Sequence, residues 1–263
     1  KERYGPWAVI TGASSGIGLE MAAPLAQAGI HLVLAARRLD RLEELAEKLR
    51  QAHGVQVETL AVDLGDADGN RRLLEATREH DVGLLVASAG FGTSGSFLDS
   101  PLEDELDMLA VNCRSLLWLS HQFGRRFAQR GRGGIVLMSS IVGFQGVPHA
   151  AHYAATKAYV QSLAEALSLE LAPRGVDVLA SAPGPTASGF ADRANMRMGA
   201  TVSSKAVAVP PLRALGRRRT VVPGFLSKFL LGSLSLLPRR FRVRMMSVVM
   251  GDMTKHQRTR QAA

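Results

Sequence analysis

The order of sequence patterns along the chain is what most limits its fold. Through residue 183, short runs rich in β-branched and aliphatic residues alternate with longer segments whose apolar residues recur at helical spacing. We expect strands at residues 7–11, 31–36, 56–62, 82–87, 135–139 and 176–181, and helices at 39–50, 102–130 and 153–172. This alternation predicts an α/β fold with one doubly wound parallel sheet and helices on both faces. Ligands of such sheets bind at the carboxyl ends of the strands.

Composition supports one folded domain. The 263 residues fit a single doubly wound domain, and the 46% hydrophobic and 21% charged residues exclude global disorder. The one cysteine, Cys113, allows neither an intramolecular disulfide nor a Cys-rich zinc site, and it suits a reducing compartment. No signal peptide is visible, and the longest apolar runs fall far short of the ~20 residues of a membrane span. We therefore expect a cytoplasmic protein.

A glycine-rich turn follows the first expected strand and opens a helix. Its spacing is G-x-x-x-G-x-G. The first glycine permits a sharp turn, the second lets the backbone approach a pyrophosphate, and the third lets the helix pack closely on the sheet. The helix N-terminus then offers free N–H groups to an anion, although an ordinary glycine-rich turn is the alternative. The expected phosphate contacts are Gly12, Ser14, Ser15, Gly16, Ile17 and Gly18.

The end of the second expected strand distinguishes between the two nicotinamide cofactors. A site for NAD would place Asp or Glu there for the ribose 2′-hydroxyl, whereas this chain has Arg37 and Arg38. Guanidinium groups match phosphate oxygens, so the pair favours the 2′-phosphate of NADP(H) over a merely solvated basic turn. Asp63, which ends the third strand, resembles an adenine-contacting position but could equally cap a helix.

Tyr153 and Lys157 are expected on one face of a helix, because residues four apart lie together. A free phenol has a pKa of ~10 and is a poor base near neutrality. A nearby ammonium and a cationic nicotinamide ring would lower the pKa of Tyr153, which could then act as a general acid in carbonyl reduction or a base in alcohol oxidation. A tyrosine packed beside a solvated lysine is the alternative.

Two further polar residues favour a catalytic role for Tyr153 and Lys157. Ser140 ends the fifth strand, where its hydroxyl could hydrogen-bond a substrate carbonyl; Ser139 is the adjacent competitor, and the spacing to Tyr153 favours Ser140. Asn112 is expected inside a long helix, where asparagine is a poor helix former. It either holds a water in a proton relay or marks a polar kink.

Together these motifs resemble the short-chain dehydrogenase/reductase family over roughly residues 5–190. The resemblance implies a Rossmann-type cofactor-binding and catalytic domain over residues 1–200, followed by a basic C-terminal helical extension of the same domain over 201–263. It also implies hydride transfer from NAD(P)H with a catalytic tetrad. In that tetrad Ser140 would polarise the carbonyl, Tyr153 would donate the proton, Lys157 would bind the ribose hydroxyls and lower the tyrosine pKa, and Asn112 would hold a relay water.

The resemblance also implies contacts to the cofactor elsewhere. These would come from Ala89, Gly90, Tyr153, Lys157, Pro183, Gly184 and Thr186. The chain departs from the family pattern where Ala87-Ser88 replaces the usual Asn-Asn, so the central sheet would be held differently, and where the spacing from Pro183-Gly184 to the threonine is shortened. The family resemblance further suggests homodimers or homotetramers built on the two long helices.

The expected activity is NADPH-dependent reduction of a carbonyl on an apolar substrate, such as a ketone, an aldehyde, a 3-oxoacyl or a steroid-like compound. The alternative is a non-catalytic NADP(H)-binding regulatory or interaction protein. Flexible apolar side chains suit a variably shaped ligand. The candidate substrate wall is Phe91, Phe144, Val147, His149, Phe190, Met196 and Met198. His149 and His152 are interpreted as pocket-rim or capping residues, and no metal is expected, since no carboxylate or cysteine has suitable spacing.

Positive charge is concentrated in the C-terminal part of the chain. The net charge is +9, yet residues 205–263 hold thirteen Lys and Arg against one acid. Residues 225–250 show a helical apolar stripe broken at Pro238 and interleaved with basic residues. Such a segment can lie on an anionic membrane, or it can pack on the body or on a second subunit. Nucleic-acid binding is not expected, because no aromatic stacking platform accompanies the arginines.

Overall fold

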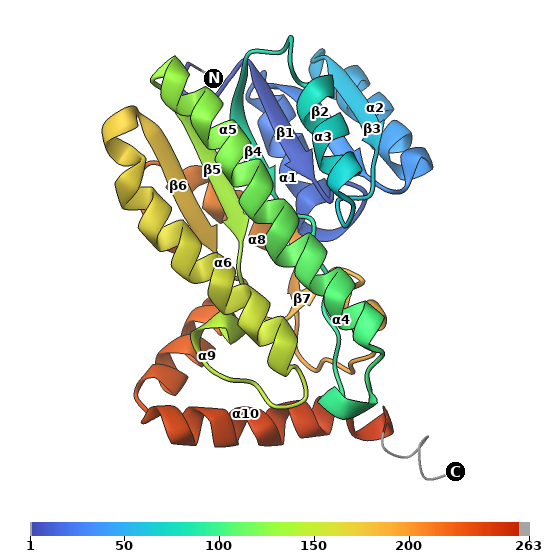
Figure 1. Ribbon diagram of the computed structural model, residues 1–263, viewed down its shortest axis with the longest axis vertical. Helices are drawn as coiled ribbons and strands as arrows, with labels where there is room; N and C mark the ends of the chain where they lie inside the picture. Colours follow the sequence, from blue (N-terminus) through green and yellow to red (C-terminus); the bar gives the residue numbers. More distant parts are fainter. Residues whose placement is uncertain (1, 258–263) are drawn as a thin grey trace.

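The computed structural model describes residues 2–257. Within them, a seven-stranded parallel sheet has the order β3-β2-β1-β4-β5-β6-β9 (Figure 1). Its strands are β1 (Trp7–Thr11), β2 (His31–Ala36), β3 (Val57–Ala61), β4 (Val82–Ala87), β5 (Gly133–Met138), β6 (Val176–Ser181) and β9 (Thr220–Val221). The strand order reverses between β1 and β4, which is where doubly wound sheets bind ligands. The predicted fold class is confirmed.

Helices cover both faces of the sheet because its strands are apolar on both sides. On one face, Ala8 and Ile10 of β1 pack against α1 and α2. On the other face, Val9 of β1 lies in a second core with Phe123 and Phe127 of α5. The longer helices of the body are α1 (Gly16–Gln27), α2 (Leu39–His53), α3 (Ala67–Ala76), α4 (Leu102–Leu109), α5 (Leu116–Arg130), α6 (Ala151–Glu170) and α8 (Ser204–Ala214).

Several local features differ from the expected pattern. The helix expected over residues 102–130 is interrupted by a π-helix, Ala110–Ser115. Residues 184–204, which show no clear period, contain the short elements β7 (Thr186–Ala187), α7 (Phe190–Arg193) and β8 (Val202–Ser203). The remaining short segments are the 3-10 turns Phe97–Asp99, Ile141–Phe144 and Ala172–Arg174. Strands of two residues carry too little periodicity to be predicted.

The C-terminal extension ends in two helices, α9 (Phe225–Ser235) and α10 (Arg239–Met253). As predicted, Pro238 separates them. Figure 1 shows α10 running across one end of the molecule, next to α9 and to the beginning of α6. Leu234, Met246 and Met250 are buried in a cluster with Val147, Ala150 and Ala154. One side of this helix pair therefore packs on the body.

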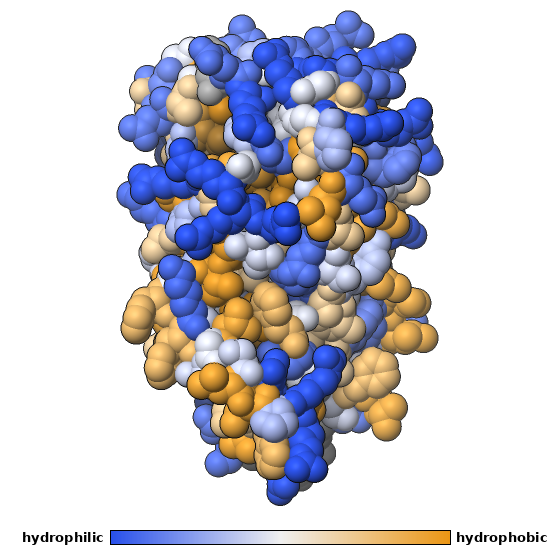
Figure 2. All heavy atoms as spheres, turned by 90° about the vertical axis from the view of Figure 1, so that its left-hand side faces the viewer, coloured by the Kyte–Doolittle hydropathy of each residue, from blue (hydrophilic) through white to orange (hydrophobic). Residues whose placement is uncertain are grey.

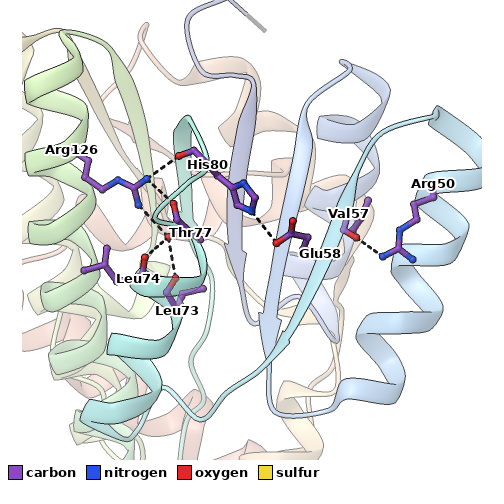
Figure 3. A network of polar contacts seen from close by, with 8 residues as sticks. All are labelled: Arg50, Val57, Glu58, Leu73, Leu74, Thr77, His80 and Arg126. Carbon is purple, nitrogen blue, oxygen red and sulfur yellow. Dashed lines mark hydrogen bonds and ion pairs between the residues drawn. The ribbon is translucent and has the colours of Figure 1, made fainter.

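A polar network ties helices and strands together at the opposite end of the sheet (Figure 3). Arg126 of α5 donates to the carbonyl oxygens of Thr77 and His80 at 2.8 and 2.9 Å. His80 in turn contacts Glu58 at 2.9 Å and stacks on Trp7 with ring centroids 4.1 Å apart. This network lies at the amino ends of the strands, which is the edge opposite to the carboxyl ends where ligands of such sheets bind.

Thr11 holds the loop that follows β4. Its hydroxyl oxygen accepts hydrogen bonds from the backbone N–H groups of Ser88 and Ala89, both at 3.1 Å. The side chain of Thr11 is almost fully buried. The family that the sequence resembles usually has an asparagine at the position of Ser88. In this chain the hydroxyl of Thr11, on the neighbouring strand β1, holds the backbone of the loop.

Replacing Thr11 with valine is expected to lower the free energy of unfolding by about 2 kcal/mol, since two N–H groups lose their acceptor while the shape is kept. Thr11→Ser retains the hydroxyl oxygen, so its free energy of unfolding should fall clearly less. The remaining loss would come from the missing methyl group. Urea unfolding of both variants measures the difference. Equal losses would show that the hydroxyl does not hold the loop.

Two helical glycines provide a matched test of packing. A Cβ added to Gly69 in α3 would lie 1.9 Å from the carbonyl oxygen of Asp63, whereas one added to Gly232 in α9 would meet no heavy atom within 4 Å. Gly69→Ala should therefore destabilise the protein by about 2 kcal/mol or more through a forced backbone shift. Gly232→Ala should stabilise it by about 0.5–1 kcal/mol, since alanine is the better helix former. Thermal unfolding of the two variants should show melting temperatures that move in opposite directions.

Candidate active site

The glycine-rich turn lies where β1 meets α1, at the carboxyl edge of the sheet. Gly12 and Gly16 have positive φ angles of 68° and 60°. A Cβ on Gly12 would lie 2.8 Å from Cα of Ala89, and one on Gly18 would lie 2.7 Å from the carbonyl oxygen of Gly12. Each position therefore requires glycine for backbone conformation or close packing. No side chain caps the N-terminus of α1, so its N–H groups can bind an anion.

The segment that follows β6 folds back over this turn. Thr186 is buried in β7 and donates to the carbonyl oxygen of Gly184 at 2.9 Å. A Cβ on Gly16 would lie 3.2 Å from Cβ of Ser188, so Ser188 borders the turn. The structure thus brings the sequence-predicted Pro183–Thr186 segment to the glycine turn, and it adds Ser188, which no sequence pattern indicates.

Both arginines at the end of β2 lie beside the turn. Arg38 donates to the hydroxyl of Ser14 at 3.1 Å and to its carbonyl oxygen at 3.4 Å. Arg37 is 3.7 Å from the carboxylate of Asp63, and both side chains are about half exposed. Asp63 also accepts from the N–H of Gly65 at 2.8 Å, so it holds the turn before α3. These residues fit a phosphate group next to a dinucleotide pyrophosphate.

Ser140 and Tyr153 meet at the junction of β5 and α6. Ser140 is the second residue after the end of β5, and its hydroxyl donates to the carbonyl oxygen of Pro183 at 3.3 Å. Tyr153 is the third residue of α6. Burial raises the pKa of Tyr153 well above its usual value, and a hydrogen bond with Ser140 offsets part of the increase. Ser139 is occupied differently, because its hydroxyl donates to the carbonyl oxygen of Lys157 at 3.0 Å.

Lys157 lies close to Tyr153, as the spacing of four residues on one helix predicts. The Lys157 Nζ atom is 5.7 Å from the centroid of the Tyr153 ring and donates to the carbonyl oxygen of Met138 at 2.8 Å. Burial lowers the pKa of Lys157 to about 8. The amine is thus held by a backbone oxygen beside the tyrosine ring. Its effect on the tyrosine pKa beside a bound nicotinamide stays a prediction.

Asn112 lies in the π-helix, as its interpretation as a polar kink suggests. Its Nδ2 donates to the carbonyl oxygen of Phe91 at 2.8 Å and to the hydroxyl of Thr156 at 3.1 Å. Its Oδ1 accepts from the N–H of Phe91 at 3.1 Å. A Cβ on Gly90 would lie 2.9 Å from this oxygen and 3.4 Å from Lys157 Nζ. Asn112 therefore joins the loop after β4 to the helix that carries Tyr153 and Lys157.

A buried carboxylate paired with His152, the residue before the tyrosine, was missed in the sequence. Glu105 is 6% exposed and contacts Nδ1 of His152 at 2.6 Å. Thr93 donates to its other oxygen at 2.8 Å. Burial alone would raise the pKa of Glu105, but hydrogen bonds from Thr93, His152 and Ser100 outweigh it and hold the pKa below its ordinary value. The acid lies 47 residues before His152, so no local spacing could indicate this pair.

Apolar side chains surround Tyr153 on the substrate side. The ring of Phe190 lies 5.0 Å from the tyrosine ring, and a Cβ on Gly92 would collide with both rings. Val147 and Met196 lie in the same cluster as Tyr153. The predicted substrate wall did not include the C-terminal helices, although methionines at helical spacing could have indicated an apolar face there. The residues that this part of the chain adds to the cluster around Tyr153 are Leu234, Met246, Met250 and Met253.

The other residues of the predicted substrate wall do not belong to the cluster that contains Tyr153. The ring of Phe91 is covered by the guanidinium of Arg193 at 3.8 Å from its centroid, and Phe144 and Met198 are half-buried. His149 and Arg193 border a cavity of about 250 Å³. Its other polar lining includes Thr93, Ser96, Asp99, Asp104, Asn195 and Gln257. Among residues 2–257, no group of three or more His, Cys, Asp or Glu side chains could hold a metal ion.

Comparisons with known proteins agree with this geometry. The family model for short chain dehydrogenases matches residues 6–198. A 7β-hydroxysteroid dehydrogenase of Clostridium sardiniense is 34% identical over 186 residues, which are 71% of each chain. A very-long-chain 3-oxoacyl-CoA reductase of Podospora anserina is 37% identical over 181 residues, 67% of this chain and 53% of that protein.

Solved structures show the same fold over most of the chain. A structure from a study of 7β-hydroxysteroid dehydrogenase stereoselectivity has a TM-score of 0.86 at 26% identity, and the match covers 93% of this chain and 98% of that one. A short-chain dehydrogenase from Sphingobium yanoikuyae in complex with NADPH has a TM-score of 0.79 at 33% identity, with 89% and 97% coverage. With its glycine turn, its Ser-Tyr-Lys cluster and its parallel sheet, this chain is an oxidoreductase of the short-chain dehydrogenase/reductase family.

Proposed function

We propose that the protein is an NADPH-dependent reductase of a carbonyl group on an apolar substrate. The single observation that carries this proposal is the position of the tyrosine of α6: Tyr153 is hydrogen-bonded to Ser140 and is packed among apolar side chains. A phenol beside a serine hydroxyl can donate its proton to a carbonyl oxygen that the serine holds by a hydrogen bond. The relatives that act on hydroxysteroids or 3-oxoacyl-CoA support a carbonyl or alcohol substrate.

The proposed mechanism assigns a separate task to each polar side chain. The cofactor, when bound, supplies the hydride. The hydroxyl of Ser140 donates a hydrogen bond to the substrate carbonyl oxygen, and Tyr153 transfers its phenolic proton to the same oxygen. Lys157, buried and with a pKa of about 8, holds the ribose hydroxyls beside Tyr153. Asn112 keeps Phe91 and Thr156 in register, so that the loop after β4 and helix α6 stay in place.

NADPH is the proposed cofactor because of the charges beside the glycine turn. Arg38 donates hydrogen bonds to Ser14 in the turn, and Arg37 lies at the same carboxyl edge of the sheet. Asp63 is the nearby acid, but it is paired with Arg37 and holds the backbone of Gly65. A 2′-phosphate would meet two guanidinium groups there. The glycines of the turn and Ala89, Gly90, Pro183, Gly184 and Thr186 would line the rest of the cofactor.

The substrate is proposed to be apolar around its carbonyl and polar at its outer end. Tyr153 is surrounded by Phe190, Val147 and Met196, which suits an aliphatic or ring-shaped body. The adjoining cavity presents hydroxyl, amide and charged groups instead. Homo-oligomers through α5 and α6 are also proposed, because Leu117, Tyr159 and Leu169 on these helices are 45%, 38% and 57% exposed.

Tyr153→Phe should abolish reduction of ketones and aldehydes by NADPH, because it removes the proton donor and keeps the ring. NADPH should still bind with nearly unchanged affinity, measured by fluorescence titration. Tyr159→Phe, on an exposed turn of the same helix, is the control and should retain full activity. Turnover retained in Tyr153→Phe would remove the assigned acid. A wild-type protein that binds NADPH but reduces none of a broad carbonyl panel would favour the non-catalytic alternative.

Arg38→Gln should raise the KM for NADPH about 10- to 100-fold and the KM for NADH much less, since the 2′-phosphate loses a charge-assisted contact whereas glutamine can still hydrogen-bond Ser14 in the turn. Arg41→Gln, one turn into α2, removes the same charge from a 60% exposed side chain and should change neither value. Steady-state kinetics with both cofactors make the comparison. An equal loss with NADPH and NADH would contradict the assignment.

A further inference from the structure

The outer sides of α9 and α10 expose large apolar side chains. On α9, Phe225 and Phe229 are 85% and 61% exposed, and their rings stack. On α10, Phe241, Met245 and Val248 are 45%, 47% and 72% exposed. Residues at this spacing lie on one side of a helix. Soluble proteins rarely expose such groups of apolar residues unless something covers them.

The opposite sides of the same helices are fixed to the body. Met246 and Met250 are buried against Ala150 and Ala154 of α6. Arg242 closes the turn between the helices, because it donates to the carbonyl oxygens of Leu237 and Ser235 at 2.7 and 2.9 Å. The helix pair is therefore held in place by its inner side, and the exposed apolar residues project from a fixed support.

The same outer sides carry unpaired positive charge. Lys228, Arg240 and Arg244 are exposed on these sides, Arg239 is exposed as the first residue of α10, and no salt bridge within residues 2–257 engages any of them. Arg240 lies over the ring of Phe241, 4.8 Å from its centroid. In Figure 2 the end of the molecule that carries α9 and α10 shows hydrophobic and strongly hydrophilic side chains interleaved. Asp252 is the acidic residue of the two helices and is exposed on the same side of α10, so the outer surface is apolar with a net positive charge.

We propose that the α9–α10 outer surface docks the protein on an anionic lipid bilayer. A second copy is a poor occupant, because a two-fold contact would place the same basic patch against itself. A bilayer with acidic headgroups offers apolar chains for the phenylalanines and negative charge for the arginines. Within residues 2–257 no helix is long and apolar enough to cross a membrane, so the contact is with the surface.

The test is co-sedimentation of the full chain with vesicles at low salt. Wild type should pellet with vesicles of equal parts phosphatidylglycerol and phosphatidylcholine and stay in the supernatant with phosphatidylcholine alone. A basic residue near such a surface contributes about fivefold in partitioning, so Arg239→Gln, Arg240→Gln and Arg244→Gln combined should weaken binding about 100-fold. High salt should have a similar effect through screening. Phe225→Ser with Phe229→Ser should also weaken binding at unchanged charge.

The matched control removes three positive charges elsewhere. Arg41, Lys48 and Arg71 are 60%, 70% and 65% exposed on α2 and α3, and their combined change to Gln should leave binding almost intact. Circular dichroism checks that all variants are folded. Equal loss in the control, or equal pelleting of wild type with both vesicle types, overturns the proposal. The proposal is also overturned if light scattering shows that the wild type is a dimer which the two serine substitutions break, while the wild type does not bind vesicles. That result would assign the surface to a second copy.

Discussion

The site depends on the contact between the end of β5 and the first turns of α6. Ser139 donates to the carbonyl oxygen of Lys157, and Lys157 donates back to the carbonyl oxygen of Met138. A Cβ on Gly143 would lie only 2.7 Å from that same Lys157 oxygen, so the chain after β5 passes the helix in backbone contact. These short-range constraints place Ser140 beside Tyr153. A shift of the helix by one turn would separate the hydroxyl groups and remove the site.

Burial at this contact determines the charge state of the site. The phenol of Tyr153 is favoured in its neutral form, and the pKa of the amine of Lys157 falls to about 8 for the same reason. The arginines after β2 remain about half exposed and hydrated. The surroundings of Tyr153 are therefore mainly apolar, whereas two hydrated guanidinium groups lie beside the glycine turn. This separation agrees with the proposed function, in which a proton is transferred at the tyrosine and a phosphate binds at the arginines.

Local sequence patterns predicted the parts of the molecule that local forces determine. The strands at 7–11, 31–36 and 82–87 match β1, β2 and β4 residue for residue, since each is a short apolar run bounded by turn residues. The glycine turn and the Tyr153–Lys157 spacing were equally readable. The irregular helix at Asn112 was predicted only as one of two alternatives, a polar kink, because the partners of this side chain, Phe91 and Thr156, are distant in sequence. The Glu105–His152 contact and the Met246 and Met250 contacts to α6 likewise exist only after the fold brings these segments together.

The two sides of α10 connect the site to the outer surface. Its inner methionines complete the apolar cluster that contains Tyr153, whereas its outer side carries Phe241, Arg244 and Val248. Thr254 and Gln257, which follow the helix, line the polar cavity next to the site. A tilt of α10 would therefore shift both the methionines of the cluster and the residues that follow the helix into the cavity wall. Because methionine side chains adapt to changed surroundings at small cost, the cluster around Tyr153 could absorb a small shift of the helix by repacking.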